Sequence, residues 1–181
     1  SRKSTGVSKN YYARIDYGDL KLTIISLHFV AQPGNKARKP ERETQAEVIR
    51  RLAVSERGKG RSVVVLGDFN DYDGQEEFSD HIVSKPITTV LKQIREMQTG
   101  TTADDLYNVT GALGKKDRYT AWWDKNRNGR VEYPYELTSI DHILLSPDLA
   151  GRIVDARIMN KDYNPADVTD HFPVVVKLNS E

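Results

Sequence analysis

The feature that most constrains the fold is the stretch VVVLGDFNDYDG, which begins at Val63. Its apolar run is short and uninterrupted, and such a run is typical of a strand buried on both faces of a sheet. Asp68, Asn70, Asp71 and Asp73 follow at once. Because these groups are costly to desolvate, they must lie where the strand ends. The sequence therefore predicts a buried strand with a polar cluster at its end.

The surrounding segments are typical of an α/β domain. Residues 11–29 predict a hairpin with a GD turn, and residues 41–55 predict an amphipathic helix. The second hairpin strand can pair in parallel with the Val63 strand across that helix. A second helix follows Pro86, and TAWW, SIDHILLS, ARIMN and HFPVVVKL predict further strands. We therefore predict one α/β domain with mixed sheets over residues 1–181.

Composition excludes several classes of site. The chain has no cysteine, which excludes disulfides, zinc–thiolate sites and thiol nucleophiles. A net charge of +1 gives no global attraction to nucleic acid, although residues 36–61 hold nine basic and four acidic residues. That segment either faces a phosphate backbone or is a solvated helix face. No apolar run predicts a membrane span, and the first residue is not Met, so we expect a processed or truncated start.

Chemically capable side chains gather at predicted strand ends. His28 follows one strand, Asp68 and Asn70 follow the next, and His171 precedes the last. Loops at strand ends of α/β sheets can direct polar groups to a common point, where ligand sites collect. The alternative is ordinary turn chemistry, because Asp, Asn and Gly also populate turns after strands. His142 neighbours Asp141 in a strand and is therefore interpreted as structural.

Four motifs decide between these interpretations. ISLHF, GDFND, SIDHILLS and TDHFPVVV occur in this order and together span residues 25–176. They resemble the endonuclease/exonuclease/phosphatase superfamily, which includes deoxyribonucleases, abasic-site endonucleases, sphingomyelinases and inositol-polyphosphate phosphatases. The resemblance implies a four-layer α/β/β/α sandwich with mixed sheets. The region of TAWW and SIDHILLS is similar to that of bacterial members, some of them secreted, although the compartment itself is not fixed.

The resemblance also implies roles for individual residues. Asp68 would handle the proton of the nucleophile or leaving group, and Asn70 would fix a water or a phosphate oxygen. Asp141 would orient His171 and favour its protonated form. His28 would be a second acid or base, or would contact phosphate.

The family resemblance implies Mg²⁺ or Mn²⁺, for which oxygen ligands are suited. Asp170 would help to bind the metal, together with Asp68 and Asn70.

One part of the family pattern is absent. The family's metal site is built around a glutamate in the first half of the domain, but the first glutamate here is Glu41, after the His28 strand. The chain therefore resembles the C-terminal two-thirds of a family domain, with its N-terminal strands missing. We expect it to be inactive or nearly so alone. We also expect its incomplete sheet to pair with the missing segment or with a second copy.

The segment DKNRNG resembles the start of a calcium loop. Asp124, Asn126 and Asn128 alternate ahead of Gly129, but the twelfth position is Tyr135 rather than glutamate. The segment is therefore either a structural Ca²⁺ site or a plain turn. The preceding Trp122 and Trp123 alternate, so one is expected to fill core while the other could contact a ligand at the surface.

The leading hypothesis is a metal-dependent phosphodiester hydrolase, a nuclease acting on DNA or RNA. Its support over other family activities is the SLHF context of His28 and the basic segment at residues 36–61. The alternative enzyme is a sphingomyelinase-like or other small-phosphodiester hydrolase. The alternative of another class is a non-catalytic module that keeps the fold and binds a partner.

Overall fold

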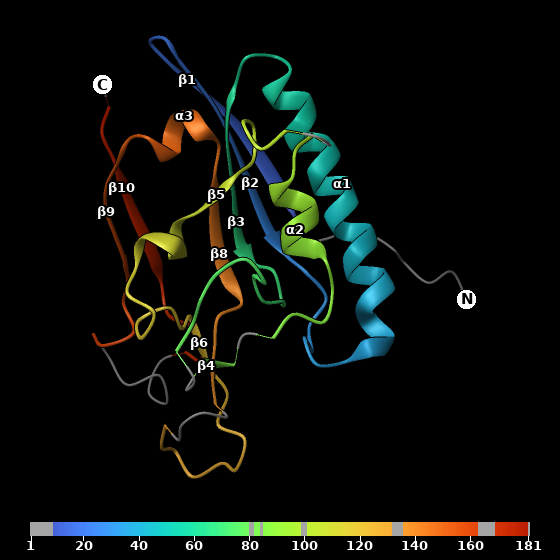
Figure 1. Cartoon of the computed structure of the whole chain (residues 1–181), viewed down its shortest axis with the longest axis vertical. Helices are drawn as coiled ribbons and strands as arrows, with labels where there is room; N and C mark the ends of the chain where they lie inside the picture. The colour runs from blue at the N-terminus through green and yellow to red at the C-terminus, as the bar shows by residue number, and fades with distance from the viewer. Residues whose placement is uncertain are drawn as a thin grey trace.

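A five-stranded mixed sheet forms the centre of the molecule in the computed structural model (Figure 1). The structure describes residues 9–79, 82–83, 85–98, 101–131, 136–162 and 169–180. The order across the central sheet is β1 (Tyr11–Tyr17), β2 (Leu20–His28), β3 (Ser62–Asp68), β8 (Asp141–Leu145) and β5 (Tyr107–Asn108). Within the described part of this sheet, β2 and β3 pair in parallel and the other neighbours pair antiparallel; the connection between β2 and β3 runs through a helix, which allows the parallel pairing.

Helices cover one face of this sheet. They are α1 (Lys39–Arg57), which has Pro40 in its first turn, and α2 (Val90–Arg95). Val63 and Val65 point toward them and are completely buried, as are Ala46 and Ala53, while Ile49 is almost completely buried. This alternation along β3 sends Val64 and Leu66 to the opposite face.

The opposite face packs against the antiparallel pair β9 (Ile153–Ile158) and β10 (Val174–Leu178). This second interface is looser, because Leu22, Ile24, Leu66 and Val176 are only partly buried there.

Shorter elements complete the described chain. They are β4 (Ile82–Val83), β6 (Ala121–Trp122) and β7 (Leu137–Thr138), which form a small sheet, then α3 (Pro147–Ala150) and the 3₁₀ turns Lys36–Arg38 and Val109–Ala112. No helix in the described part of the chain has the length and apolar character needed to cross a membrane.

The predicted α/β sandwich with mixed sheets is confirmed, and so is the parallel pairing across the first helix. Three layers are seen: α1 with α2, the central sheet, and the β9–β10 pair (Figure 1). Among the described residues, no helix lies over the outer face of β9–β10, where Val154 and Val175 are exposed.

The helix after Pro86 is shorter than the sequence predicts, because it begins only at Val90. The Asp71 carboxylate accepts the backbone N–H groups of Ile87 and Thr88, which holds those residues outside the helix.

Candidate active site

Three neighbouring strands bring three of the predicted site residues into one row. Asp68 is the last residue of β3 and pairs with His28 at the end of β2 on one side. On its other side it pairs with Asp141 at the start of β8. The His28 Nε2 atom lies 3.5 Å from Asp68 Oδ2. These residues are far apart in the sequence, so it is the register of strand pairing that brings them together.

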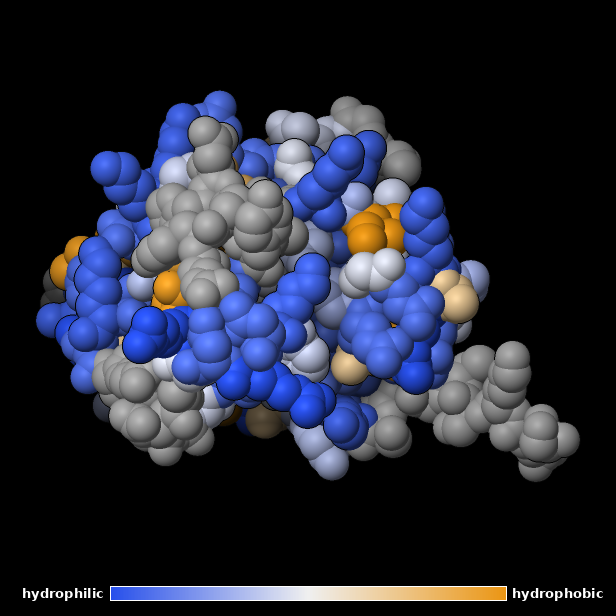
Figure 2. All heavy atoms as spheres, turned by 90° about the horizontal axis from the view of Figure 1, so that it is seen from below, coloured by the Kyte–Doolittle hydropathy of each residue, from blue (hydrophilic) through white to orange (hydrophobic). Residues whose placement is uncertain are grey.

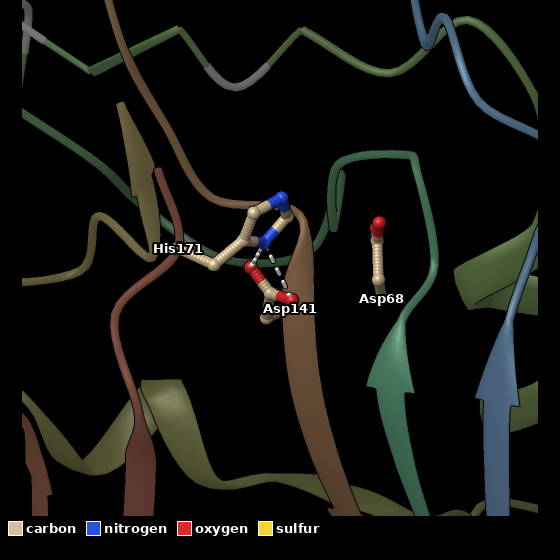
Figure 3. A group of neighbouring side chains, drawn as sticks. All are labelled: Asp68, Asp141 and His171. Atoms are coloured by element: carbon tan, nitrogen blue, oxygen red, sulfur yellow. Dashed lines mark hydrogen bonds and ion pairs between the residues drawn. The ribbon is translucent and has the colours of Figure 1, made fainter. Parts of the chain in front are cut away.

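His171 reaches this row from the segment that leads into β10. Its Nδ1 atom lies 2.9 and 3.0 Å from the two carboxylate oxygens of Asp141 (Figure 3). An isolated antiparallel bridge to Ala121 holds its backbone in place. Figure 3 shows Asp68 on the neighbouring strand, on the other side of Asp141 from His171. The structure thus forms the predicted Asp–His pair.

Asn70 turns back onto Asp68 in a tight loop. Its backbone N–H and its side-chain Nδ2 donate to the two Asp68 oxygens at 2.8 Å each, and Nδ2 also donates to the carbonyl of Phe29. The backbone of Asn70 has φ +48°, a left-handed conformation that asparagine tolerates better than most residues. Asn70 is 4% exposed, and its buried side chain fixes the orientation of the Asp68 carboxylate through the Nδ2 hydrogen bond.

The surroundings of the two histidines push their pKa values in opposite directions. The hydrogen bond that the His171 imidazole donates to Asp141 raises the pKa of His171 to about 9, so this imidazole is protonated at neutral pH. Burial lowers the pKa of His28, with smaller contributions from positive charge on Lys9 and His171. His28 is therefore neutral at the same pH. Such a separation is how sites provide a proton donor and a proton acceptor together.

Asp68 lies between these two histidines and has an unusual pKa itself. Burial raises the pKa of Asp68 to about 6, and repulsion from Asp141 adds to the effect. The hydrogen bonds from Asn70 and the positive charge of His171 act against this increase. A carboxyl group with a pKa near neutral can accept and return a proton during a reaction.

Thr120 is a site residue that the sequence patterns did not reveal. Its hydroxyl oxygen accepts the backbone N–H groups of Ile140 and Asp141 at 3.0 and 2.9 Å. Its carbonyl oxygen accepts the N–H of Phe172 at 2.7 Å, next to His171. The completely buried Thr120 therefore connects both halves of the Asp–His pair.

His142 supports the loop that follows Asn70. Its Nε2 atom lies 3.1 Å from the carbonyl oxygen of Asp71, and its Nδ1 lies 3.1 Å from Nδ2 of Asn108. Since a carbonyl only accepts and an amide nitrogen only donates, these partners select the neutral form with its proton on Nε2. Burial also lowers the pKa of His142. The residue is structural, as its position next to Asp141 predicts.

The donor set fits a small oxygen-seeking cation. One carboxylate oxygen each from Asp68 and Asp141, together with a His171 nitrogen, lie within 4.8 Å of one another. A cation would relieve the repulsion between the two carboxylates, and Mg²⁺ takes one or two carboxylates in addition to waters and phosphate oxygens. His171 is protonated, so it is not expected to be a ligand. Asp170 is exposed and does not belong to this group among the described residues.

The loop at residues 124–130 closes on its own backbone. Asp124 accepts the N–H groups of Asn128 and Gly129, Asn126 accepts that of Asn128, and Asn128 accepts that of Arg130. These bonds form a turn. Position 135, the twelfth of the calcium pattern, lies outside the described residues, and the Ca²⁺ site stays a prediction.

Sequence comparison places the chain in a family. Residues 3–171 match the model of the Endonuclease/Exonuclease/phosphatase family. The chain belongs to this family. The match extends across nearly the whole sequence and includes the segments that carry His28, Asp68, Asp141 and His171. No curated protein sequence matches the chain.

Solved structures share the fold of this family member. The catalytic domain of Xenopus laevis APE2 has a TM-score of 0.62 and 21% identity, covering 93% of this chain and 54% of that one. The 3′ phosphatase NExo from Neisseria, bound to a product DNA hairpin, has a TM-score of 0.63 and 17% identity, covering 87% and 61%. TDP2 from D. rerio, complexed with a single-strand DNA product, has a TM-score of 0.60 and 17% identity, covering 94% and 61%. The chain therefore spans between half and two-thirds of the length of these structures.

Proposed function

We propose that this chain carries the catalytic residues His28, Asp68, Asp141 and His171 of a metal-dependent phosphodiester hydrolase, a nuclease acting on DNA or RNA. The observation that carries the proposal is the row of His28, Asp68 and Asp141, completed by the protonated His171. Cleaving a phosphodiester requires a positive group near the phosphoryl oxygens and a proton acceptor for the attacking water. It also requires a proton for the leaving alkoxide. The row and His171 together offer all three functions at one end of the central sheet.

Each residue has a role that follows from its surroundings. His171 supplies positive charge to a phosphoryl oxygen, and Asp141 keeps it protonated and oriented. Asp68 moves the proton of the nucleophile or leaving group, since its pKa of about 6 allows both states near neutral pH. His28 is a second proton acceptor, and Asn70 fixes Asp68 and a water or phosphate oxygen.

A divalent metal completes this chemistry. Asp68 and Asp141 would hold Mg²⁺ or Mn²⁺, which would supply charge neutralisation at the phosphate. Asn70 and Asp170 stay predicted as further ligands, although Asp170 lies outside this group in the structure.

Nucleic acid is the proposed substrate. Two proteins of the same fold are described in complexes with DNA products. The end of the molecule at which β3 stops is seen in Figure 2, and its described surface is mainly hydrophilic. The SLHF context of His28 adds to this support, whereas in the basic segment at residues 36–61 Arg42 and Arg61 are buried and Arg57 and Lys59 pair with carboxylates.

We further propose that the chain corresponds to the C-terminal two-thirds of a family domain. It covers 54% to 61% of the three structures above, and one face of its central sheet is only partly buried. A cavity of about 380 Å³ lies beside His171, with apolar walls that include Leu66, Ile143 and Val174. Residues of a preceding segment, or of a second copy, would fill this space. The isolated chain is therefore expected to have little activity.

The test is hydrolysis of plasmid DNA and of bis(p-nitrophenyl) phosphate with Mg²⁺, with Mn²⁺ and with EDTA. The proposal predicts weak metal-dependent cleavage that His171→Ala abolishes, and stronger cleavage when the residues encoded upstream of Ser1 are included. Full activity of the 181 residues alone would contradict the fragment proposal. If the longer chain also cleaves neither substrate in any metal, the hydrolase proposal is wrong and the fold is a binding module.

A further inference from the structure

Trp123 differs sharply from its neighbour. Trp122 is 5% exposed, packs with Leu137 and Phe172, and donates its indole N–H to Glu136. Trp123 is 67% exposed. A tryptophan ring offers more apolar contact area than most side chains, so leaving it in water forgoes a large gain from burial. The exposed ring therefore has a large apolar surface available for contact with a ligand.

The position of Trp123 relates it to the candidate site. Its backbone N–H donates to the carbonyl of Glu136 at 2.9 Å, which extends the β6–β7 ladder by one residue. Alternation along this strand therefore places Trp123 on the same side as Ala121. Ala121 pairs with His171 and packs against Tyr72, in the loop beyond Asn70. Two residues of strand span roughly 7 Å, so Trp123 lies close to the His171 backbone.

Three basic residues follow the exposed ring in the chain. Lys125, Arg127 and Arg130 are all exposed on the loop that follows, and none of them forms an ion pair within the described part of the chain. Arg127 has φ +61°, at the bend of the loop. Within residues 124–130 the acidic residue is Asp124, whose carboxylate accepts two backbone N–H groups, and Glu136 accepts the backbone N–H of Lys125. An aromatic face beside unpaired basic groups is the combination that binds single-stranded nucleic acid.

We propose that Trp123 stacks on an unpaired base of the nucleic acid while the loop at residues 124–130 contacts its backbone. This inference rests on the proposed function, because it places an unpaired stretch of the nucleic-acid substrate beside Trp123, next to His171 in the candidate site. A membrane surface fits less well. The exposed indole is followed by charged and amide side chains, whereas a membrane-binding surface would carry further large apolar groups.

The test measures binding rather than cleavage. Fluorescence anisotropy of a labelled oligothymidylate is recorded in EDTA, with the wild-type chain and with Trp123→Ala, Trp123→Phe and Tyr17→Ala. Tyr17 is the matched control, because it is 82% exposed and lies at the hairpin turn, away from the strand ends that carry the site. If Trp123 stacks on one base, Trp123→Ala should weaken binding by about 5-fold or more. Trp123→Phe should keep most of the wild-type affinity, and Tyr17→Ala should have no effect.

The outcomes separate this inference from the proposed function. Binding by the wild type that Trp123→Ala leaves unchanged overturns the stacking role, whatever the hydrolysis assay shows. Absence of oligonucleotide binding also overturns it. Binding that depends on Trp123 supports the stacking role even if no metal produces cleavage, in which case the hydrolase proposal alone fails. Vesicles of phosphatidylserine are tested in parallel, and stronger Trp123-dependent binding to them than to the oligonucleotide would overturn the choice of nucleic acid.

Discussion

Replacing Asp141 by asparagine should return His171 to ordinary acid–base behaviour. The two carboxylate oxygens of Asp141 lie 2.9 and 3.0 Å from His171 Nδ1, and this hydrogen bond is the largest cause of the raised pKa. The substitution keeps the shape of the side chain but removes its charge. We therefore expect the pKa of His171 to fall from about 9 toward its ordinary value of 6.5, because burial is then opposed only by the weaker charge effects of Asp68 and Asp170.

The size of the associated stability change follows from the same values. A pKa raised from 6.5 to about 9 corresponds to about 3 kcal/mol at 1.36 kcal/mol per pKa unit. His171 is 36% exposed, so solvent screening reduces this to about 1 to 1.5 kcal/mol of folding stability. Because the pKa of His171 is higher in the folded chain, its protonation stabilises the fold. This stabilisation is fully present below the unfolded value of 6.5 and is lost as the pH rises through about 9. The wild type should therefore lose this contribution between these two pH values, and Asp141→Asn should not.

Two measurements check this prediction. The imidazole resonances followed against pH give the pKa of His171, and urea unfolding of both chains at about pH 6 and about pH 10 gives the difference in stability. Asp170→Asn is the matched control, since Asp170 is the weakest of the named causes and its removal should lower the pKa only slightly. An unchanged His171 pKa in Asp141→Asn would refute the assignment of Asp141 as its orienting partner.

Three further substitutions test the framework around the site. Gly67→Ala should lower the free energy of unfolding by about 2 to 4 kcal/mol, because Gly67 has φ +132° and a Cβ there would overlap the Leu27 carbonyl; urea unfolding that matches the wild type would contradict this. Thr120→Val should cost about 2 to 4 kcal/mol, since two buried N–H groups lose their acceptor, whereas Thr120→Ser should cost about 1 kcal/mol; equal effects in thermal unfolding would show that the hydroxyl is unimportant. Glu56→Gln should destabilise the chain at neutral pH, because the hydrogen bonds from Arg14 and then Lys59 hold the pKa of this carboxyl well below its usual range. That difference should disappear in acid, as the pH falls below 4.5 and through the lower folded value, and a difference independent of pH would be evidence against it.

Much of the candidate site could be found from the sequence because its residues follow local patterns. Asp68 and Asn70 come directly after an apolar run, and His28 comes at the end of a β-rich strand. Thr120 gave no such signal. It precedes a strand of only two residues, and its importance arises from hydrogen bonds to Ile140 and Asp141, which are about twenty positions away. A threonine that accepts distant backbone N–H groups looks the same in the sequence as one on the surface.

The sequence by itself determined the strand β3, the hairpin β1–β2 and the helix α1. Each of these depends on periodicity and turn residues within a few positions, so no distant contact is needed to specify it. The tertiary structure alone decided that β8 places Asp141 beside Asp68, and that His28 and His171 differ in charge at neutral pH. Both histidines lie at strand ends, but their pKa values depend on burial and on charges contributed by remote segments. Coulomb interactions and desolvation act through space, and chain folding decides which groups are near.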